Sequence, residues 1–173
     1  MDASVKEIIW RQYGAAIDML TEALQNCPPE LWEARMYTAP EDLPPNYSSF
    51  WYTAFHTLFW MDLDMSGRVV EGFQPPAPFT LDELDPAGIV PPVYSKEELL
   101  GYAAYCREKA RAMLLGLTDA QAKTSCRFGG VEAPFAELLL YSMRHVQEHG
   151  GQLSLFLGQN GIDAGRWVAV ARE

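Results

Sequence analysis

The residues best suited to chemistry in this chain are its only three histidines, His56, His145 and His149. His145 and His149 are four residues apart, so on a helix both imidazoles leave the same face one turn apart. Two imidazoles placed in this way can bind one ion with N–metal bonds of about 2.0–2.1 Å. His56 lies among apolar residues, where an imidazole without a polar partner would be costly to bury. One shared divalent ion would satisfy all three rings.

Other polar residues near the histidines have less specific interpretations. Gln152 follows His149 by three residues and shares its helix face, so we expect it to hold a metal-bound water or substrate. Glu148, Asp62 and Asp64 are expected at the surface, although Asp64 is the better placed of the two aspartates to approach His56. A pair of histidines four apart also arises by chance, and a lone buried histidine is commonly a hydrogen-bonded core residue. The pattern alone therefore leaves both interpretations open.

Apolar residues recur every three or four positions in four segments, which predicts four helices over residues 4–26, 47–66, 95–117 and 134–157. Capping-box patterns mark two of the starts, at Ser4–Glu7 and Ser95–Glu98. Pro134 is a favoured first-turn residue for the last helix, and glycines follow its end. The sequence therefore predicts an all-α protein, a four-helix bundle formed by one domain over residues 1–173.

The connections between these helices constrain their directions. The segment 68–94 is long and rich in proline, so it can run the full height of a bundle and allow the second and third helices to be parallel. The connector would then be a long crossover between these two helices. Such a connector serves either as a functional lid or as a packed strap, and the sequence favours neither. Helix 47–66 is apolar almost all round, which requires cover on several sides, from the bundle or from a second copy of the chain.

Composition excludes several classes of protein. The net charge of −10 argues against nucleic-acid binding, which needs clustered lysine and arginine. No apolar run is long enough to span a membrane, and the first ten residues lack the apolar centre of a signal peptide, so we expect a cytoplasmic protein. The three cysteines lack metal-knuckle spacing and are expected to be buried free thiols.

Three segments of the sequence resemble the DinB-like superfamily of small bacterial metalloproteins with a four-helix bundle. They are FHTLFWMDLDMSG over residues 55–67, FTLDELDPAGIVPPVYSKEELLGY over residues 79–102 and RHVQEHGGQLSLFLGQNG over residues 144–161. The superfamily pattern is one histidine on the second helix and an HxxxH pair on the fourth, which His56, His145 and His149 match. The resemblance implies that these three are ligands of one divalent ion, mostly nickel or zinc, with iron as a further option. It also implies an up-down-down-up order of the four helices, which the long connector at 68–94 allows, and frequent homodimers.

Proteins similar to this one include thiol S-transferases that use bacillithiol and relatives of mycothiol-dependent maleylpyruvate isomerase. The leading hypothesis is therefore a metal-dependent transferase or isomerase that acts on a small-molecule substrate through a low-molecular-weight thiol. Three protein ligands plus an open position are typical of catalytic metal sites. The alternatives are a metal-dependent hydrolase and a non-catalytic binding or stress protein that the metal stabilises. The sequence does not identify the metal, the thiol or the substrate.

Overall fold

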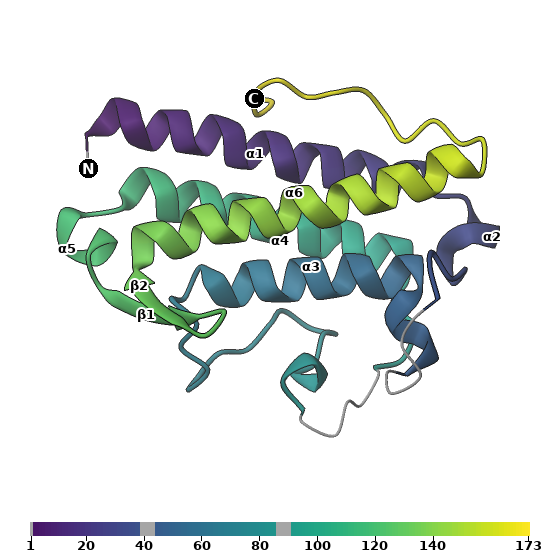
Figure 1. The fold of residues 1–173 in the computed structure, drawn as a ribbon, viewed down its shortest axis with the longest axis horizontal. Helices are drawn as coiled ribbons and strands as arrows, with labels where there is room; N and C mark the ends of the chain where they lie inside the picture. Colours follow the sequence, from purple (N-terminus) through teal and green to yellow (C-terminus); the bar gives the residue numbers. More distant parts are fainter. Residues whose placement is uncertain (1, 39–43, 86–90) are drawn as a thin grey trace.

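A computed structural model describes residues 2–38, 44–85 and 91–173 of the chain. Four long helices dominate it (Figure 1). The helices and strands are α1 (Ala3–Asn26), α2 (Pro29–Trp32), η1 (Pro45–Ser48), α3 (Phe50–Asp64), η2 (Asp82–Leu84), α4 (Lys96–Gly116), α5 (Asp119–Ala122), β1 (Ser125–Phe128), β2 (Val131–Pro134) and α6 (Phe135–Gln159). The prediction of an all-α protein is confirmed, apart from one small two-stranded sheet.

The long helices pack side by side, with α1 against α4 and α6, and α3 against α6 and α4. Figure 1 shows α3 and α4 running in the same direction, opposite to α1 and α6. The chain therefore follows the predicted up-down-down-up order, because the connector between α3 and α4 returns along the helices. No helix in the described part of the chain combines the length and the apolarity that a membrane crossing requires.

The starts of α1 and α4 show how caps are selected. At α4, Ser95 and Glu98 form the predicted capping box, in which each side chain binds the backbone N–H of the other. At α1 the predicted box at Ser4 is wrong. Asp2 is the N-cap instead, and its carboxylate accepts a hydrogen bond from the Ser4 backbone N–H at 2.8 Å. The Asp2 carboxylate lies two residues before Ser4, so it caps a free backbone N–H at the start of α1 and the helix begins earlier than predicted.

Helix α3 lies at the centre of the core, which explains its lack of a polar face. Trp51 and Phe55 are 1% and 0% exposed, and nearly all other residues of α3 are buried too. Its carboxylates are buried with them, so the predicted surface position of Asp62 and Asp64 is wrong. Since the aromatic residues of α3 are covered within one chain, their apolarity no longer calls for a second subunit.

The connector between α3 and α4 is a packed strap in its described part, which leaves out residues 86–90. Phe79 stacks on Tyr102 of α4 with ring centroids 4.3 Å apart, and on Phe55 at 6.0 Å. These contacts hold η2 against α3 and α4. The later part of the predicted connector, including Pro86, lies outside the described residues.

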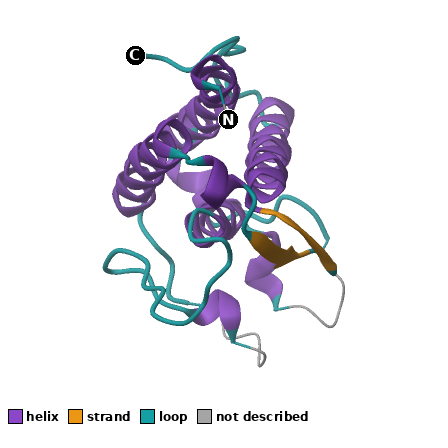
Figure 2. Ribbon diagram, turned by 90° about the vertical axis from the view of Figure 1, so that its left-hand side faces the viewer, coloured by secondary structure: helices purple, strands orange, loops and turns teal. Residues whose placement is uncertain are grey.

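The segment 118–133 contains structure that the sequence did not predict. Besides the short helix α5, strands β1 and β2 pair antiparallel around the positive-φ glycines Gly129 and Gly130. The hairpin lies at one edge of the helices (Figure 2).

After α6 the chain returns along α1, where the Ala171 N–H donates to the Arg11 carbonyl at 2.7 Å. All three cysteines are buried free thiols, as predicted.

Candidate metal centre

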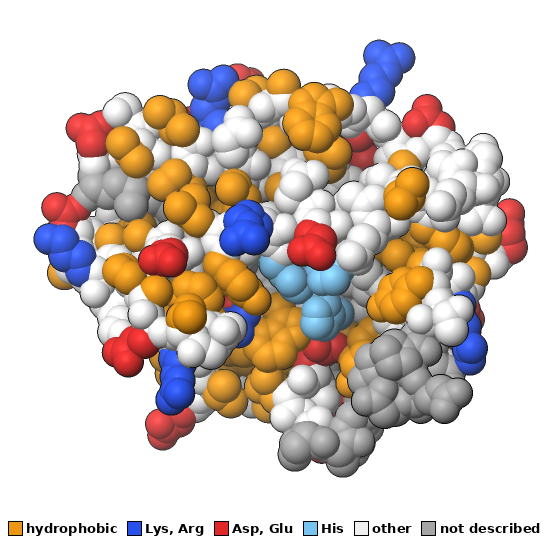
Figure 3. Space-filling model, in the orientation of Figure 1, with side chains coloured by type: hydrophobic (Ala, Val, Ile, Leu, Met, Phe, Trp, Pro, Cys, Tyr) orange, Lys and Arg blue, Asp and Glu red, His pale blue; other side chains and the backbone are white. Residues whose placement is uncertain are grey.

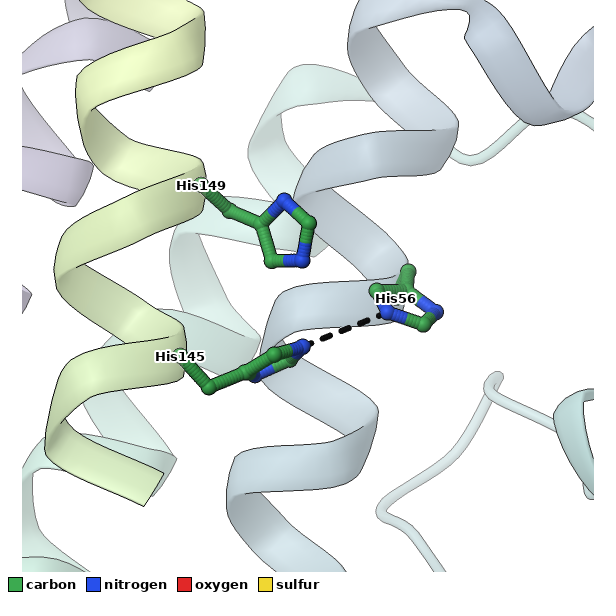
Figure 4. Close-up of side chains that lie close together, drawn as sticks. All are labelled: His56, His145 and His149. Carbon is green, nitrogen blue, oxygen red and sulfur yellow. Dashed lines mark hydrogen bonds between the residues drawn. The ribbon is translucent and has the colours of Figure 1, made fainter. Parts of the chain in front are cut away.

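The three histidines converge on one point between α3 and α6 (Figure 4). His145 and His149 project from successive turns of α6, and His56 faces them from α3. One ring nitrogen of each residue lies within 4.8 Å of the other two. The Nε2 atoms of His145 and His56 are 3.3 Å apart. Helix packing thus brings together all three residues that the sequence singled out, here called the histidine triad.

The far side of the His56 ring is held by a residue from the connector. Its Nδ1 lies 2.9 Å from Oε2 of Glu83, a residue of η2 whose side chain is only 4% exposed. Since a carboxylate oxygen accepts hydrogen bonds, Nδ1 must carry the proton, which leaves the Nε2 lone pair facing the triad. The pKa of Glu83 is lowered, because hydrogen bonds and charge from His56 outweigh the opposing effect of burial. Sequence reasoning missed this residue.

The His149 ring is held in the same way from its own helix. Its Nδ1 lies 2.7 Å from the Gln152 side-chain oxygen, one turn further along α6. Here too the proton belongs on Nδ1 and the Nε2 lone pair is left for the triad. Gln152 thus lies on the same helix face as His149, as its spacing predicted, but its side-chain oxygen contacts the histidine ring itself. Its predicted role of holding a metal-bound water or substrate stays a prediction. Glu148 is exposed, as expected.

The geometry of the triad fits a small divalent ion. Nitrogens that bind a tetrahedral ion at about 2.0–2.1 Å lie about 3.3 Å from each other, which is the separation of His56 and His145. The remaining spacings, all within 4.8 Å, require side-chain shifts of about 1 Å. Nδ1 of His145 is buried and has no hydrogen-bond partner among the described residues, so this ring finds its polar contacts only on its Nε2 side. A cation on that side would bind the Nε2 lone pair.

The surroundings of His145 and His149 disfavour the charged form of both rings. Burial lowers the pKa of His145 to about 3, and positive charge on His149, His56 and Arg68 acts in the same direction. Burial also lowers the pKa of His149, although the hydrogen bond to Gln152 opposes the shift. Neutral imidazoles are the form that binds metal, so protons compete weakly for these two rings near neutral pH.

The low pKa of His145 predicts an acid-sensitive fold in the metal-free protein. The unfolded chain takes up a proton on this residue below pH 6.5, whereas the folded chain does so only near pH 3. Stability contributed by the neutral ring is therefore complete above pH 6.5 and falls as the pH drops, by about 2 kcal/mol at pH 5. Urea denaturation of chelator-treated protein from pH 7.5 to 5 measures this slope. In His145→Asn the slope should be smaller, and an equal slope would contradict the prediction.

The triad is reachable from outside the protein. Figure 3 shows histidine side chains near the middle of one face, beside hydrophobic side chains. A pocket of about 90 Å³ adjoins two of them, about the volume of three water molecules. It is lined by Tyr37, Tyr47, Tyr52, Thr53, His56 and His149. A ligand entering here would place only a small group beside the triad.

The fold and the site together define an all-α protein with a candidate metal centre built from three histidines on two neighbouring helices. The chain belongs to the DinB superfamily, whose family model matches residues 12–153. This match runs from α1 into α6 and contains the whole triad. A search of curated proteins finds no significant match.

Proposed function

We propose that this protein holds one divalent ion on His56, His145 and His149 and acts as a metal-dependent thiol S-transferase or isomerase. The observation that carries the proposal is the convergence of three imidazoles on a point that adjoins an open pocket. The DinB superfamily, to which the chain belongs, includes metal-binding proteins. Three further properties stay predictions: that the ion is nickel or zinc, that the protein is a homodimer, and that it is located in the cytoplasm.

A triad of protein ligands favours a reactive site over a purely structural one. Structural zinc sites generally have four protein ligands, whereas catalytic sites have three and an open position. When bound, a divalent ion would supply Lewis acidity and lower the pKa of a coordinating thiol. The protein would contribute the orientation of the rings, through Glu83 and Gln152, and the tyrosine-lined pocket that limits what reaches them.

The hydrolase alternative requires a general base free to accept a proton beside the ion. Glu83 contacts the triad, but its Oε2 binds Nδ1 of His56, the ring nitrogen on the side away from His145, and so does not lie beside the point where the ion would be. We therefore rank the hydrolase below the thiol-dependent enzyme. The non-catalytic alternative, in which the metal only stabilises the helices, does not explain the open pocket beside the triad.

A thiol titration of cobalt- or nickel-substituted protein tests the proposal. If a low-molecular-weight thiol reaches the open position, a sulfur-to-metal charge-transfer band should appear at a pH well below the free thiol pKa of about 8.5. Bacillithiol, mycothiol, coenzyme A and glutathione are the thiols to test. The S-methylated form of each is the matched control, because it lacks the proton that coordination would displace.

Cys106 is excluded as the source of such a band by its burial and by a control variant. Burial raises the pKa of Cys106, the thiol buried on α4, so it resists deprotonation. Cys106→Ser should also retain the band. If none of the four thiols perturbs the metal spectrum at millimolar concentration, the thiol-transferase proposal fails, and the hydrolase and structural-metal alternatives become the leading hypotheses.

A further inference from the structure

Glu83 is a buried carboxylate that belongs to neither helix of the triad. It lies in η2, within the connector, 27 residues after His56. Its Oε2 accepts two hydrogen bonds, from His56 Nδ1 at 2.9 Å and from Trp60 Nε1 at 2.8 Å. Such a group needs a reason to be buried, because a carboxylate is costly to remove from water.

The two donors to Glu83, His56 and Trp60, belong to one stripe of α3 that begins with Tyr52. Tyr52, His56 and Trp60 follow each other at intervals of four residues, so their side chains lie one above the other. The Tyr52 hydroxyl at the end of this stripe is buried and makes no hydrogen bond within the described residues, and the same holds for Glu83 Oε1. The Glu83 carboxylate is near enough to raise the pKa of Tyr52, after burial, which raises it most. The connector carboxylate thus docks against a stripe whose central member is a triad histidine.

Aromatic packing on the same connector fixes where Glu83 sits. Phe79, four residues earlier, is buried and stacks on Tyr102, while Leu81 and Leu84 pack against the core from either side of Glu83. The carboxylate is therefore held by the strap and not by a freely rotating surface side chain. Any change in the position of the strap must move the hydrogen bond to His56.

We propose that Glu83 is the positioning residue of the metal centre, and that through it metal binding and docking of the connector stabilise each other. This inference rests on the metal site proposed above. A carboxylate that accepts from the outer nitrogen of a ligand histidine fixes the tautomer and raises the basicity of the ligating nitrogen. Coupling between metal binding and docking of the connector is reciprocal. An ion on His56 raises the equilibrium constant for docking by the same factor by which docking raises the affinity for the ion.

Glu83→Gln tests the inference, because it keeps the size of the side chain and removes its charge. The affinity for cobalt or zinc, measured by chelator competition, should fall about 10- to 100-fold, and the visible spectrum of the cobalt protein should shift. In the unmodified protein, added zinc should slow amide hydrogen exchange in residues 80–85, and in Glu83→Gln this protection should be lost. Circular dichroism verifies that the helices remain.

Asp82→Asn is the matched control, since Asp82 is in the same turn but accepts its hydrogen bond from Thr80 at 2.6 Å. It should bind metal as the unmodified protein does. If His145→Ala loses metal while Glu83→Gln keeps the original affinity, spectrum and exchange protection, the positioning role is overturned and the metal site stands. If the unmodified protein and the His145→Ala variant bind metal equally poorly, both the metal site and this inference are overturned.

Discussion

Replacing either His145 or His149 with alanine should remove most of the divalent ion from the purified protein. The unmodified chain is expected to carry up to one ion, held by three imidazole nitrogens that lie within 4.8 Å of one another. Losing one of three ligands should cost more than the 10- to 100-fold loss typical when an outer partner of a ligand is changed. Elemental analysis after gel filtration, together with chelator competition, measures the loss.

The control for this experiment is Glu148→Gln, on the same helix. Glu148 is exposed and lies outside the triad, so its replacement should leave the metal content unchanged. Lowering the pH should release the ion from the unmodified protein, because imidazole must be neutral to bind it. Unchanged metal in both alanine variants would refute the site, and with it the proposed function.

The triad was predictable because its determinants are local and geometric. The spacing of four residues from His145 to His149 places both rings on one face of any helix, and the apolar stripe around them shows that this face points inward. Placing His56 opposite them needed the packing of α3 on α6, which the residue pattern alone left open and the resemblance to the DinB-like superfamily supplied. The residues that contact the outer nitrogens of the triad also differ in how predictable they are. Gln152 is one turn from His149 on the same helix, so its position on the face of the triad could be predicted.

Glu83 could not be predicted, because nothing periodic relates a connector residue to a helix residue 27 positions earlier. Its contact depends on how the strap folds back, which is a tertiary property. The short strands around Gly129 and Gly130 were missed for another reason. Each is only four residues long, so alternation has too few positions to be recognised, although paired glycines between two short segments are a hairpin signal.

The wrong placement of Asp62 and Asp64 has an instructive physical cause. A charged residue is expected at the surface, yet a helix that is apolar nearly all round has no surface to offer. Asp64 is paired with Arg68 just beyond the end of its helix, and Asp62 with Lys109 on α4. The apolarity of α3 was itself the signal that its carboxylates would be buried and would need partners.

This arrangement predicts a large loss of stability when Lys109 is replaced with methionine. Asp62 is 0% exposed, and Lys109 donates both to its carboxylate and, at 3.1 Å, to its backbone carbonyl. Without the ammonium, the carboxylate keeps only the Tyr102 hydroxyl, a neutral donor at 2.9 Å. Removing one partner of a buried pair costs about 3–5 kcal/mol because it leaves a buried charge uncompensated. We expect about 3 kcal/mol, at the lower end, since 27% of the Lys109 side chain is exposed and water can reach the site.

Urea denaturation of metal-free protein at pH 7 measures this change in the free energy of unfolding. Lys6→Met on α1 is the matched control, because Lys6 is half-buried and makes only a 3.4 Å hydrogen bond to the Leu115 carbonyl, so the change should be within about 0.5 kcal/mol. Adding Asp62→Asn to Lys109→Met should restore part of the loss, since the neutral amide removes the unpaired charge. If Lys109→Met is no more destabilising than Lys6→Met, the pair does not compensate a buried charge in solution. If the double variant is as unstable as the sum of its two single variants, the loss comes from side-chain packing and not from electrostatics.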